Sequence, residues 1–452
     1  MNQQNAILTF DKFGAAFGEK VILNNVNLNI ENKNITTLLG PSGTGKSTLL
    51  RAITGLNSNN PTFKTWGDIS FCGEKLSPDN LPSIVTQSAK LVMKSLLENI
   101  IHNLPERNNL NQIQQKDLAV RLLENANLHE LKDSLNENVV TLPLVLQRRV
   151  AIIRLVSAGP RLLCLDEPTS GISNQDEVDQ LLQHIKDEAK RRAILIVLHN
   201  QQQAKQLGGY ATLLAGGQIK EFKKSEKFFN TPQTELAKQF VKSGSCNTPS
   251  PMAKPEDLNE ETAAPEPISE TIKNYVSESF GPRGFLWLLK GKLAGTPLPG
   301  VFFEENYDLK ALQRVGITHL ISTTLKPVSV EKLKPFNIQG KSFPIKDMET
   351  PTLDNAVEVC EFIDHIIKND GVVAVHCRAG LGRTGTVLAL YLIWKNSDAM
   401  SALEKARTIE PRWVQSEQQV KFLDTFSDYV NEKASPQSCD TEHHSTDISN
   451  AI

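Results

Sequence analysis

Two short stretches of the sequence carry residues whose types and spacing suit the chemistry of phosphate. The first, LLGPSGTGKSTLL (38–50), places glycines around Lys46 and Ser47, between an apolar run and a helix-like run. Glycines let backbone N–H groups close around a phosphate, and the N-terminus of the following helix adds favourable charge. The second, VAVHCRAGLGRTGT (373–386), sets Cys377 six residues before Arg383 in a glycine-rich loop. One chain therefore carries two separate sets of residues suited to phosphate.

The first stretch fits the pattern G-x-x-x-x-G-K-[ST], which is typical of a nucleotide-binding loop. The Lys46 ammonium would reach the β- and γ-phosphates, and the Ser47 hydroxyl would bind Mg²⁺. A second motif, LLCLDEP (162–168), supplies Asp166 for the metal shell and Glu167 to polarise the attacking water. Together they predict a P-loop fold whose nucleotide-binding residues are Gly40, Pro41, Ser42, Gly43, Thr44, Gly45, Lys46, Ser47, Thr48 and Asp166.

Residues 5–242 resemble the ATP-binding-cassette ATPases, and the run TGLNSNNPTFKTWGDISFCGEKL (54–76) is most similar to the phosphate-importer branch. The resemblance implies ATP and Mg²⁺ as cofactors. It also implies that Phe17 stacks on adenine and that His199 is a catalytic switch histidine. Gln87 corresponds to the glutamine that senses the γ-phosphate, contributes to the Mg²⁺ site and contacts a transmembrane partner.

The family's signature, L-S-G-G-Q, is replaced here by LPLVL (142–146). In the family's dimer, the signature serine and bare glycine backbone cap the γ-phosphate bound by the opposite subunit. Pro143 lacks both a hydroxyl and an N–H, and Leu144 and Val145 bring side chains where close backbone approach is needed. We therefore expect ATP binding with slow hydrolysis by a homodimer, so that a second ATPase subunit is one expected partner.

The second stretch fits H-C-x5-R, with Cys377 as a nucleophile and Arg383 as a bidentate phosphate ligand. Converging loop N–H groups and the following helix N-terminus stabilise a thiolate and hold the oxygens of a phosphoryl group. The predicted phosphate-binding residues around these two are His376, Arg378, Ala379, Gly380, Leu381, Gly382 and Thr384.

Residues 281–433 resemble the protein tyrosine phosphatases, specifically the compact dual-specificity enzymes. The resemblance implies a general acid upstream, which Asp347 matches in position and in its neighbours. Asp354 is the alternative, but it directly precedes a helix-like run and is better explained as an N-cap. The Thr384 hydroxyl would help the thiolate leave, and Gln418 would position water. His376 would orient the loop and tune Cys377.

The order of these segments predicts an α/β chain of two ordered domains. Apolar strand-like runs alternate with helix-like runs over residues 1–242 and again over 281–433, which favours mostly parallel sheets covered by helices. Residues 243–280 are rich in Pro, Ser and Glu, which predicts a disordered linker. The polar residues 434–452 predict a flexible tail.

Composition narrows the class of protein and its partners. The 452 residues carry a net charge of −2, 39% hydrophobic and 22% charged residues, and six scattered cysteines without CxxC pairs. This argues against a nucleic-acid partner, a disulfide framework and a zinc site. No apolar run is long enough to span a bilayer. We expect a cytoplasmic chain that reaches the inner face of the membrane through a permease partner.

Two functions remain open from the sequence. In the first, the chain is bifunctional: an importer-associated ATPase joined to a phosphatase acting on a phosphorylated protein or a small phosphate ester. In the second, the N-terminal half transports nothing and is a nucleotide-binding module that regulates the phosphatase. The altered signature favours the second, whereas Gln87, Glu167 and His199 favour the first.

Overall fold

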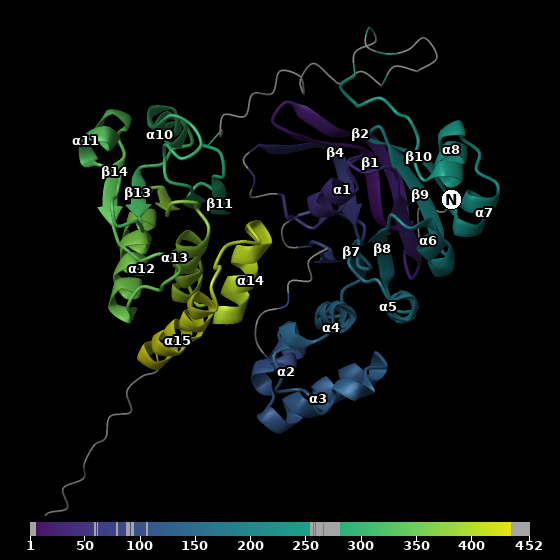
Figure 1. Cartoon of the computed structure of the whole chain (residues 1–452), viewed down its shortest axis with the longest axis horizontal. Coiled ribbons are helices and arrows are strands. Elements are labelled where there is room, and N and C mark those ends of the chain that lie inside the picture. Colours follow the sequence, from purple (N-terminus) through teal and green to yellow (C-terminus); the bar gives the residue numbers. More distant parts are fainter. Residues whose placement is uncertain are drawn as a thin grey trace, which may run out of the picture.

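The computed structural model describes residues 6–57, 60, 62–77, 80–86, 91, 95–104, 107–253, 256, 258, 265 and 281–434. The chain forms an N-terminal domain (residues 6–253) and a C-terminal domain (residues 281–434), which lie beside each other in Figure 1. Both are α/β, as the alternation of apolar runs predicts.

The N-terminal domain contains two sheets. A mostly parallel sheet has the strand order β10-β9-β3-β8-β7-β6, with only β9 and β10 antiparallel. An antiparallel sheet, which the sequence analysis did not predict, has the order β2-β1-β4-β5. The strands are β1 (Ala6–Phe17), β2 (Lys20–Glu31), β3 (Ile35–Leu39), β4 (Phe63–Phe71), β5 (Glu74–Lys75), β6 (Ser83–Val85), β7 (Leu162–Asp166), β8 (Ala193–Val197), β9 (Tyr210–Ala215) and β10 (Gln218–Lys224).

Helices pack around the parallel sheet, and α2, α3 and α4 form a lobe to one side of the strands (Figure 1). The central strands β3, β7 and β8 are mostly apolar and are buried along their whole length, as expected for strands covered on both faces. The helices are α1 (Lys46–Ile53), α2 (Leu96–Ile101), α3 (Gln112–Asn125), α4 (Leu144–Val156), α5 (Gln175–Ala189), α6 (Gln201–Leu207), α7 (Ser225–Asn230) and α8 (Glu235–Ser243), with a short 3₁₀ turn, η2 (Arg107–Asn109).

The C-terminal domain is built on one five-stranded sheet of order β11-β12-β15-β13-β14, in which only β11 and β12 are antiparallel. The strands are β11 (Leu286–Leu289), β12 (Leu293–Thr296), β13 (His319–Ser322), β14 (Gln339–Ser342) and β15 (Val373–His376). The central strand β15 is fully buried and runs straight into the cysteine loop.

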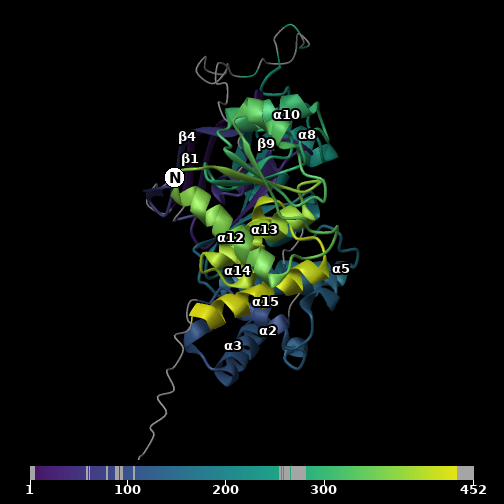
Figure 2. The same cartoon turned by 90° about the vertical axis from the view of Figure 1, so that its left-hand side faces the viewer.

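One face of this sheet packs against four helices and the other against two. Buried apolar side chains join the first face to α12 (Leu353–Lys368), α13 (Gly382–Trp394), α14 (Ala399–Ile409) and α15 (Glu417–Ala434). Figure 2, viewed from the side of this domain, shows these four helices together. A second cluster joins the opposite face to α10 (Glu305–Arg314) and α11 (Val330–Leu333). Helix α13 is buried along almost its whole length, as its apolar sequence predicts.

Residues 244–253 are packed, although the sequence predicts a disordered linker beginning at residue 243. The Cys246 side chain is buried, and the Val21 N–H donates to the Met252 sulfur at 3.2 Å. Pro251 also lies close to Gly217, at the turn between β9 and β10. These few apolar groups are enough to hold the segment against the N-terminal domain, so the ordered part of this domain ends later than predicted.

Within the described residues, no helix is both long enough and apolar enough to cross a membrane.

Candidate functional site

The loop between β3 and α1 has the backbone geometry of a phosphate cradle. Gly40, Gly43 and Gly45 all adopt positive φ angles, of 146°, 77° and 99°. A Cβ on Gly40 would lie 2.1 Å from the Leu214 carbonyl oxygen, so no larger residue fits there. The loop therefore turns sharply and directs its N–H groups to one place at the start of α1.

The Lys46 side chain turns back into this loop. Its Nζ donates to the carbonyl oxygens of Gly40 at 2.9 Å and Pro41 at 2.8 Å, and the side chain is buried. Burial lowers the pKa of Lys46, while the nearby Glu167 and Asp166 carboxylates act in the opposite direction. An ammonium held within the loop by carbonyl oxygens is placed to exchange them for phosphate oxygens.

Ser47 and Asp166 come together although they are far apart in sequence. The Ser47 hydroxyl donates to Asp166 Oδ1 at 3.0 Å. Strands β3 and β7 both pair in parallel with β8, which brings the start of α1 and the end of β7 to the same edge of the sheet. Burial raises the pKa of Asp166, and the Ser47 hydrogen bond opposes that effect. The two oxygens form a pair that suits Mg²⁺, which prefers oxygen ligands.

Glu167 and His199 form the second close pair of this site. His199 Nε2 lies 2.6 Å from Glu167 Oε1, and both side chains are partly exposed. Glu167 has a positive φ of 49°, a backbone conformation that is uncommon for residues other than glycine and often found at functional sites. The structure thus places the predicted catalytic glutamate and switch histidine in direct contact.

The prediction for the nucleotide site also included Phe17, Gln87 and the altered signature. Phe17 packs against Phe63, with ring centroids 5.0 Å apart. Gln87 lies outside the described residues. Pro143 is the N-cap of α4 and provides no side-chain cap, while Leu144 is exposed and Val145 is buried. The altered signature therefore forms the N-terminus of a helix whose N-cap residue, Pro143, provides no side-chain hydrogen bond.

In the C-terminal domain, the cysteine loop lies between β15 and α13. Cys377 is 3% exposed at the base of this loop. Gly380 has a φ of 74°, and a Cβ there would lie 2.6 Å from the Pro297 nitrogen. Trp413 Nε1 donates to the Gly380 carbonyl oxygen at 3.0 Å. The tight turn at Gly380 and the Trp413 hydrogen bond hold the loop in shape around the thiol.

Asp347 and Arg383 meet above this loop. Arg383 forms an ion pair with Asp347 Oδ1 at 3.0 Å, and its NH1 donates to the Ile345 carbonyl oxygen at 3.0 Å. The Arg383 side chain is 9% exposed, whereas that of Asp347 is 82% exposed. The structure therefore brings the predicted general acid to the predicted phosphate ligand, with one group buried and the other reaching solvent.

His376 and Thr384 are buried beneath the loop. His376 Nδ1 lies 3.2 Å from the Cys377 carbonyl oxygen. Burial lowers the pKa of His376 to about 4, and the Arg383 charge acts in the same direction. Thr384 Oγ1 is buried with no hydrogen-bond partner among the described residues. A neutral His376 fits an orienting role, and the Thr384 hydroxyl is free to donate to a group within the loop.

The glutamine that touches the loop is Gln415, which the sequence analysis missed. Its Oε1 accepts from the Gly382 N–H at 3.1 Å. Gln418, the predicted residue, is exposed on α15, while Gln419 is buried and its Oε1 accepts from the Gln415 N–H at 2.9 Å. Three glutamines lie within five positions, and sequence alone offers no signal for choosing among them.

The other residues predicted for this loop differ in their exposure to solvent. Arg378 and Ala379 are exposed, Leu381 is half-buried, and Gly382 is buried. The Arg378 carbonyl oxygen accepts from the Leu298 N–H at 3.2 Å, which ties the loop to the segment after β12.

The predicted N-cap role of Asp354 is wrong. The N-cap of α12 is Thr352, whose hydroxyl accepts from the Asn355 N–H, and Asp354 is an exposed residue in the first turn. Threonine and aspartate both favour the start of a helix, so the sequence leaves the boundary open by two residues.

Comparison with known proteins addresses the N-terminal domain first. A family model described as ABC transporter matches residues 23–170. The phosphate import ATP-binding protein PstB of Staphylococcus saprophyticus is 30% identical over 240 residues, which are 50% of this chain and 80% of that protein. The chain belongs to the ABC transporter family.

Further relatives of this ABC protein carry the same description. PstB 2 of Bacillus subtilis is 29% identical over 250 residues, covering 53% of this chain and 92% of that protein. PstB of Oceanobacillus iheyensis is 28% identical over 256 residues, covering 53% and 90%. Among solved structures, a nucleotide-free ATP-binding cassette from an ABC transporter matches with a TM-score of 0.41 and 20% identity, over 48% of this chain and 91% of that one.

The C-terminal domain of this ABC protein matches a different family. A model described as polymorphic toxin system, DSP-PTPase phosphatase, covers residues 295–397, which include Asp347, Cys377 and Arg383. The chain thus joins an ABC ATPase domain to a phosphatase domain, and both belong to families of enzymes.

Proposed function

We propose that the C-terminal domain hydrolyses phosphate monoesters through a phosphocysteine formed on Cys377. The observation that carries this proposal is the contact of Asp347 with Arg383, which lies six residues after the buried Cys377. Asp347 supplies an acid, and Arg383 supplies a cation that can bind two phosphate oxygens. The loop before α13 supplies the nucleophile, Cys377.

The proposed reaction has two steps. The Cys377 thiolate attacks phosphorus, an S–P bond forms, the P–O ester bond breaks, and Asp347 gives its proton to the leaving oxygen. Water then attacks phosphorus, the S–P bond breaks, Asp347 takes the proton, and inorganic phosphate leaves. In both steps the loop N–H groups and Arg383 hold the equatorial oxygens, where charge develops.

Hydrolysis of an aryl phosphate tests this proposal. The chain in EDTA should release phosphate, and Cys377→Ser should abolish turnover because a hydroxyl is a far weaker nucleophile. Undiminished activity of Cys377→Ser would place the chemistry elsewhere.

We propose that the N-terminal domain binds Mg-ATP at the loop between β3 and α1. Lys46 and the loop N–H groups would hold the phosphates, while Ser47 and Asp166 would hold Mg²⁺. Mg²⁺, when bound, offsets phosphate charge. The Ser47–Asp166 pair and the inward turn of Lys46 fit this use. Glu167, oriented by His199, would accept the proton of an attacking water.

Equilibrium binding of Mg-ATP tests the nucleotide site. Wild-type chain should bind, and Lys46→Ala should not, since the variant lacks the ammonium that faces the loop. Equal affinities in the two proteins would contradict the assignment.

Phosphate import, which the names of the PstB relatives describe, is one candidate role for the N-terminal domain. It would need a transmembrane permease and would place the chain at the inner face of a membrane. The resemblance assigns the contact with such a partner to Gln87. The adjacent Thr86 lines a small cavity that Glu404 and Thr408 of the C-terminal domain also line. A permease at this place would compete with the C-terminal domain.

That shared cavity favours the second role, in which the N-terminal domain regulates the phosphatase. Purification of the chain from its native membrane fraction discriminates between the two roles. Recovery with a permease would support import, and recovery without one would support regulation.

A further inference from the structure

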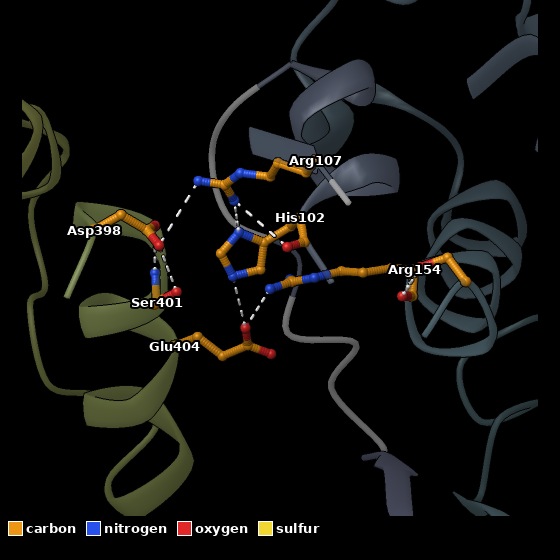
Figure 3. A network of polar contacts seen from close by, with 7 residues as sticks. His102, Arg107, Arg154, Asp398, Ser401 and Glu404 are labelled. Carbon is orange, nitrogen blue, oxygen red and sulfur yellow. Dashed lines mark hydrogen bonds and ion pairs between the residues drawn. The ribbon is translucent and has the colours of Figure 1, made fainter. Parts of the chain in front are cut away.

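Helix α14 of the C-terminal domain makes charged contacts with the helical lobe of the N-terminal domain. The Glu404 carboxylate accepts a hydrogen bond from the Arg154 guanidinium of α4. His102 Nε2, just after α2, lies 3.4 Å from the same carboxylate oxygen. Figure 3 shows both side chains pointing from the N-terminal domain toward Glu404. One carboxylate of the C-terminal domain thus joins two helices of its neighbour.

A second charged contact lies at the start of α14. Arg107 lies 3.7 Å from Asp398, and its NH1 donates to His102 Nδ1 at 2.8 Å. Arginine only donates, so His102 Nδ1 accepts and Nε2 carries the hydrogen that faces Glu404. Burial by itself raises the pKa of Asp398, but hydrogen bonds from Ser401 and the Arg107 charge outweigh it and hold that pKa below its usual range. Asp398 therefore stays ionised and attracts Arg107.

The central pair is buried on the N-terminal side. The Arg154 side chain is 3% exposed and that of Glu404 30% exposed. Beside them lies a cavity of about 60 Å³, lined by Val85, Leu91 and Leu155 and closed by Glu404 and Thr408. A buried guanidinium is costly without an anionic partner, so the contact depends on the charge of Glu404.

The N-terminal side of this contact is connected to the nucleotide site. Val85 pairs with Leu165, the residue before Asp166, and the adjacent Thr86 carbonyl oxygen accepts from Arg148 of α4 at 3.2 Å. Helix α4, which carries Arg154 in its last turn, also begins at the altered signature. Strand β6 therefore links the candidate Mg²⁺ ligand Asp166 to the contact, and helix α4 links the altered signature to it.

The C-terminal side is connected to the cysteine loop. Arg407 of α14 donates to the carbonyl oxygens of Trp413 at 3.3 Å and Val414 at 2.7 Å. Trp413 in turn donates to the Gly380 carbonyl oxygen. Val414 has a φ of 60°, which is strained for a β-branched residue, so this segment is held by its contacts. A shift of α14 would therefore reach the loop that surrounds Cys377.

We propose that the surface formed by α2, η2 and α4 is the docking surface for α14, and that occupation of the nucleotide site changes the phosphatase rate through the Arg154–Glu404 contact. This rests on the proposed phosphatase and ATP-binding activities. Nucleotide binding would shift β6 and α4, and the buried charge pair would pass that shift to α14 and the cysteine loop. Such coupling requires a contiguous physical connection, and the contacts above supply one.

The test compares initial rates of aryl-phosphate hydrolysis by the full chain with and without Mg-ATP. In wild type, Mg-ATP should change the rate by roughly fivefold or more, a typical size of coupling between sites. Lys46→Ala should remove the response because it does not bind the nucleotide. Glu404→Gln should also remove it while keeping ATP binding. The matched control is Glu417→Gln, which changes an exposed glutamate that pairs with Lys421 of the same helix and should respond as wild type does.

Hydrogen exchange supplies a second measurement that needs no turnover. In wild type, Mg-ATP should change amide exchange over residues 399–409, and Glu404→Gln should raise exchange there without nucleotide because docking is weakened. Undiminished rate and exchange responses in Glu404→Gln would overturn the proposed route, and their absence in a wild type that binds Mg-ATP would overturn the coupling. A chain without phosphatase activity that still shows the exchange response would contradict only the proposed reaction.

Discussion

The Arg383 guanidinium lies 3.0 Å from the Asp347 carboxylate, so the two residues proposed to act on opposite ends of a phosphate ester are ion-paired with each other. A carboxylate oxygen here occupies a position on Arg383 that a phosphoryl oxygen would take. Substrate must therefore displace Asp347 from Arg383. Once released from Arg383, Asp347 can face the leaving oxygen, where a general acid acts.

Replacement of Asp347 by alanine should lower kcat and strengthen the binding of phosphate. We expect kcat to fall by roughly 10²–10⁴-fold, the usual contribution of a general acid. Inhibition by inorganic phosphate should become stronger, because the ion pair that competes for Arg383 is gone. Steady-state kinetics with phosphate as the inhibitor measure both effects. A weaker phosphate inhibition would show that Asp347 does not compete for Arg383.

Asp354→Ala is the matched control for that variant. Asp354 is exposed in the first turn of α12, where its carboxylate adds favourable charge to the helix. We expect kcat to stay close to the wild-type value. A large loss in Asp354→Ala, with little loss in Asp347→Ala, would reverse the assignment of the general acid.

Substitutions of Gln415 and of Gln418 should affect the second step, hydrolysis of the phosphocysteine, differently. Gln415 reaches the Gly382 N–H, whereas Gln418 is exposed on α15. Gln415→Ala should slow hydrolysis of the phosphocysteine by roughly 10–10²-fold, as expected when a water-positioning group is lost. Gln418→Ala should have little effect. Rapid-mixing kinetics should show a burst of alcohol release in Gln415→Ala, since the phosphoenzyme accumulates. A burst confined to Gln418→Ala would restore the role first predicted for that residue.

The altered signature predicts slow ATP hydrolysis by the chain alone. Loss of one preorganised donor commonly costs about 10²–10³-fold in rate, and Pro143, Leu144 and Val145 together remove several. Changing them to Ser, Gly and Gly should raise ATPase activity while Mg-ATP affinity changes little. The measurement is the rate of phosphate release from ATP by the unmodified chain and by the triple variant. Fast turnover by the unmodified chain would contradict slow hydrolysis and restore an ordinary transport ATPase.

Acid should destabilise the C-terminal domain through His376. Its pKa is about 4 in the folded domain, below the ordinary value of 6.5 that it regains on unfolding. The neutral form is therefore favoured by folding. The corresponding stability is fully present above pH 6.5 and is lost as the pH falls from 6.5 toward 4. Between pH 7.5 and pH 5.5 the loss should be about 1 kcal/mol.

Urea unfolding of residues 281–434 at these two pH values measures that loss. His376→Asn should reduce the difference between the two free energies of unfolding, because asparagine does not titrate. An unchanged difference in the variant would assign the acid sensitivity to another group.

Much of the fold was predictable because its signals are local. Strands β3, β7, β8 and β15 are short apolar runs, and α5 and α12 have one apolar face each, so their positions follow from sequence periodicity. The antiparallel sheet of β1, β2, β4 and β5 was missed, since its long strands alternate irregularly and contain register shifts. The packing of residues 244–253 was missed because it depends on a few apolar contacts with a distant turn.

By itself, the sequence determined the two phosphate loops. Each is a contiguous run in which glycine conformation, a following helix and one or two charged side chains act over a few residues, so composition and spacing are sufficient. Tertiary structure alone decided which distant groups complete these loops: Ser47 with Asp166, Arg383 with Asp347, and Gln415 with Gly382. It also decided the contact of Arg154 with Glu404 between the two domains. These pairs depend on how strands are ordered and how helices pack, and no short-range pattern encodes that arrangement.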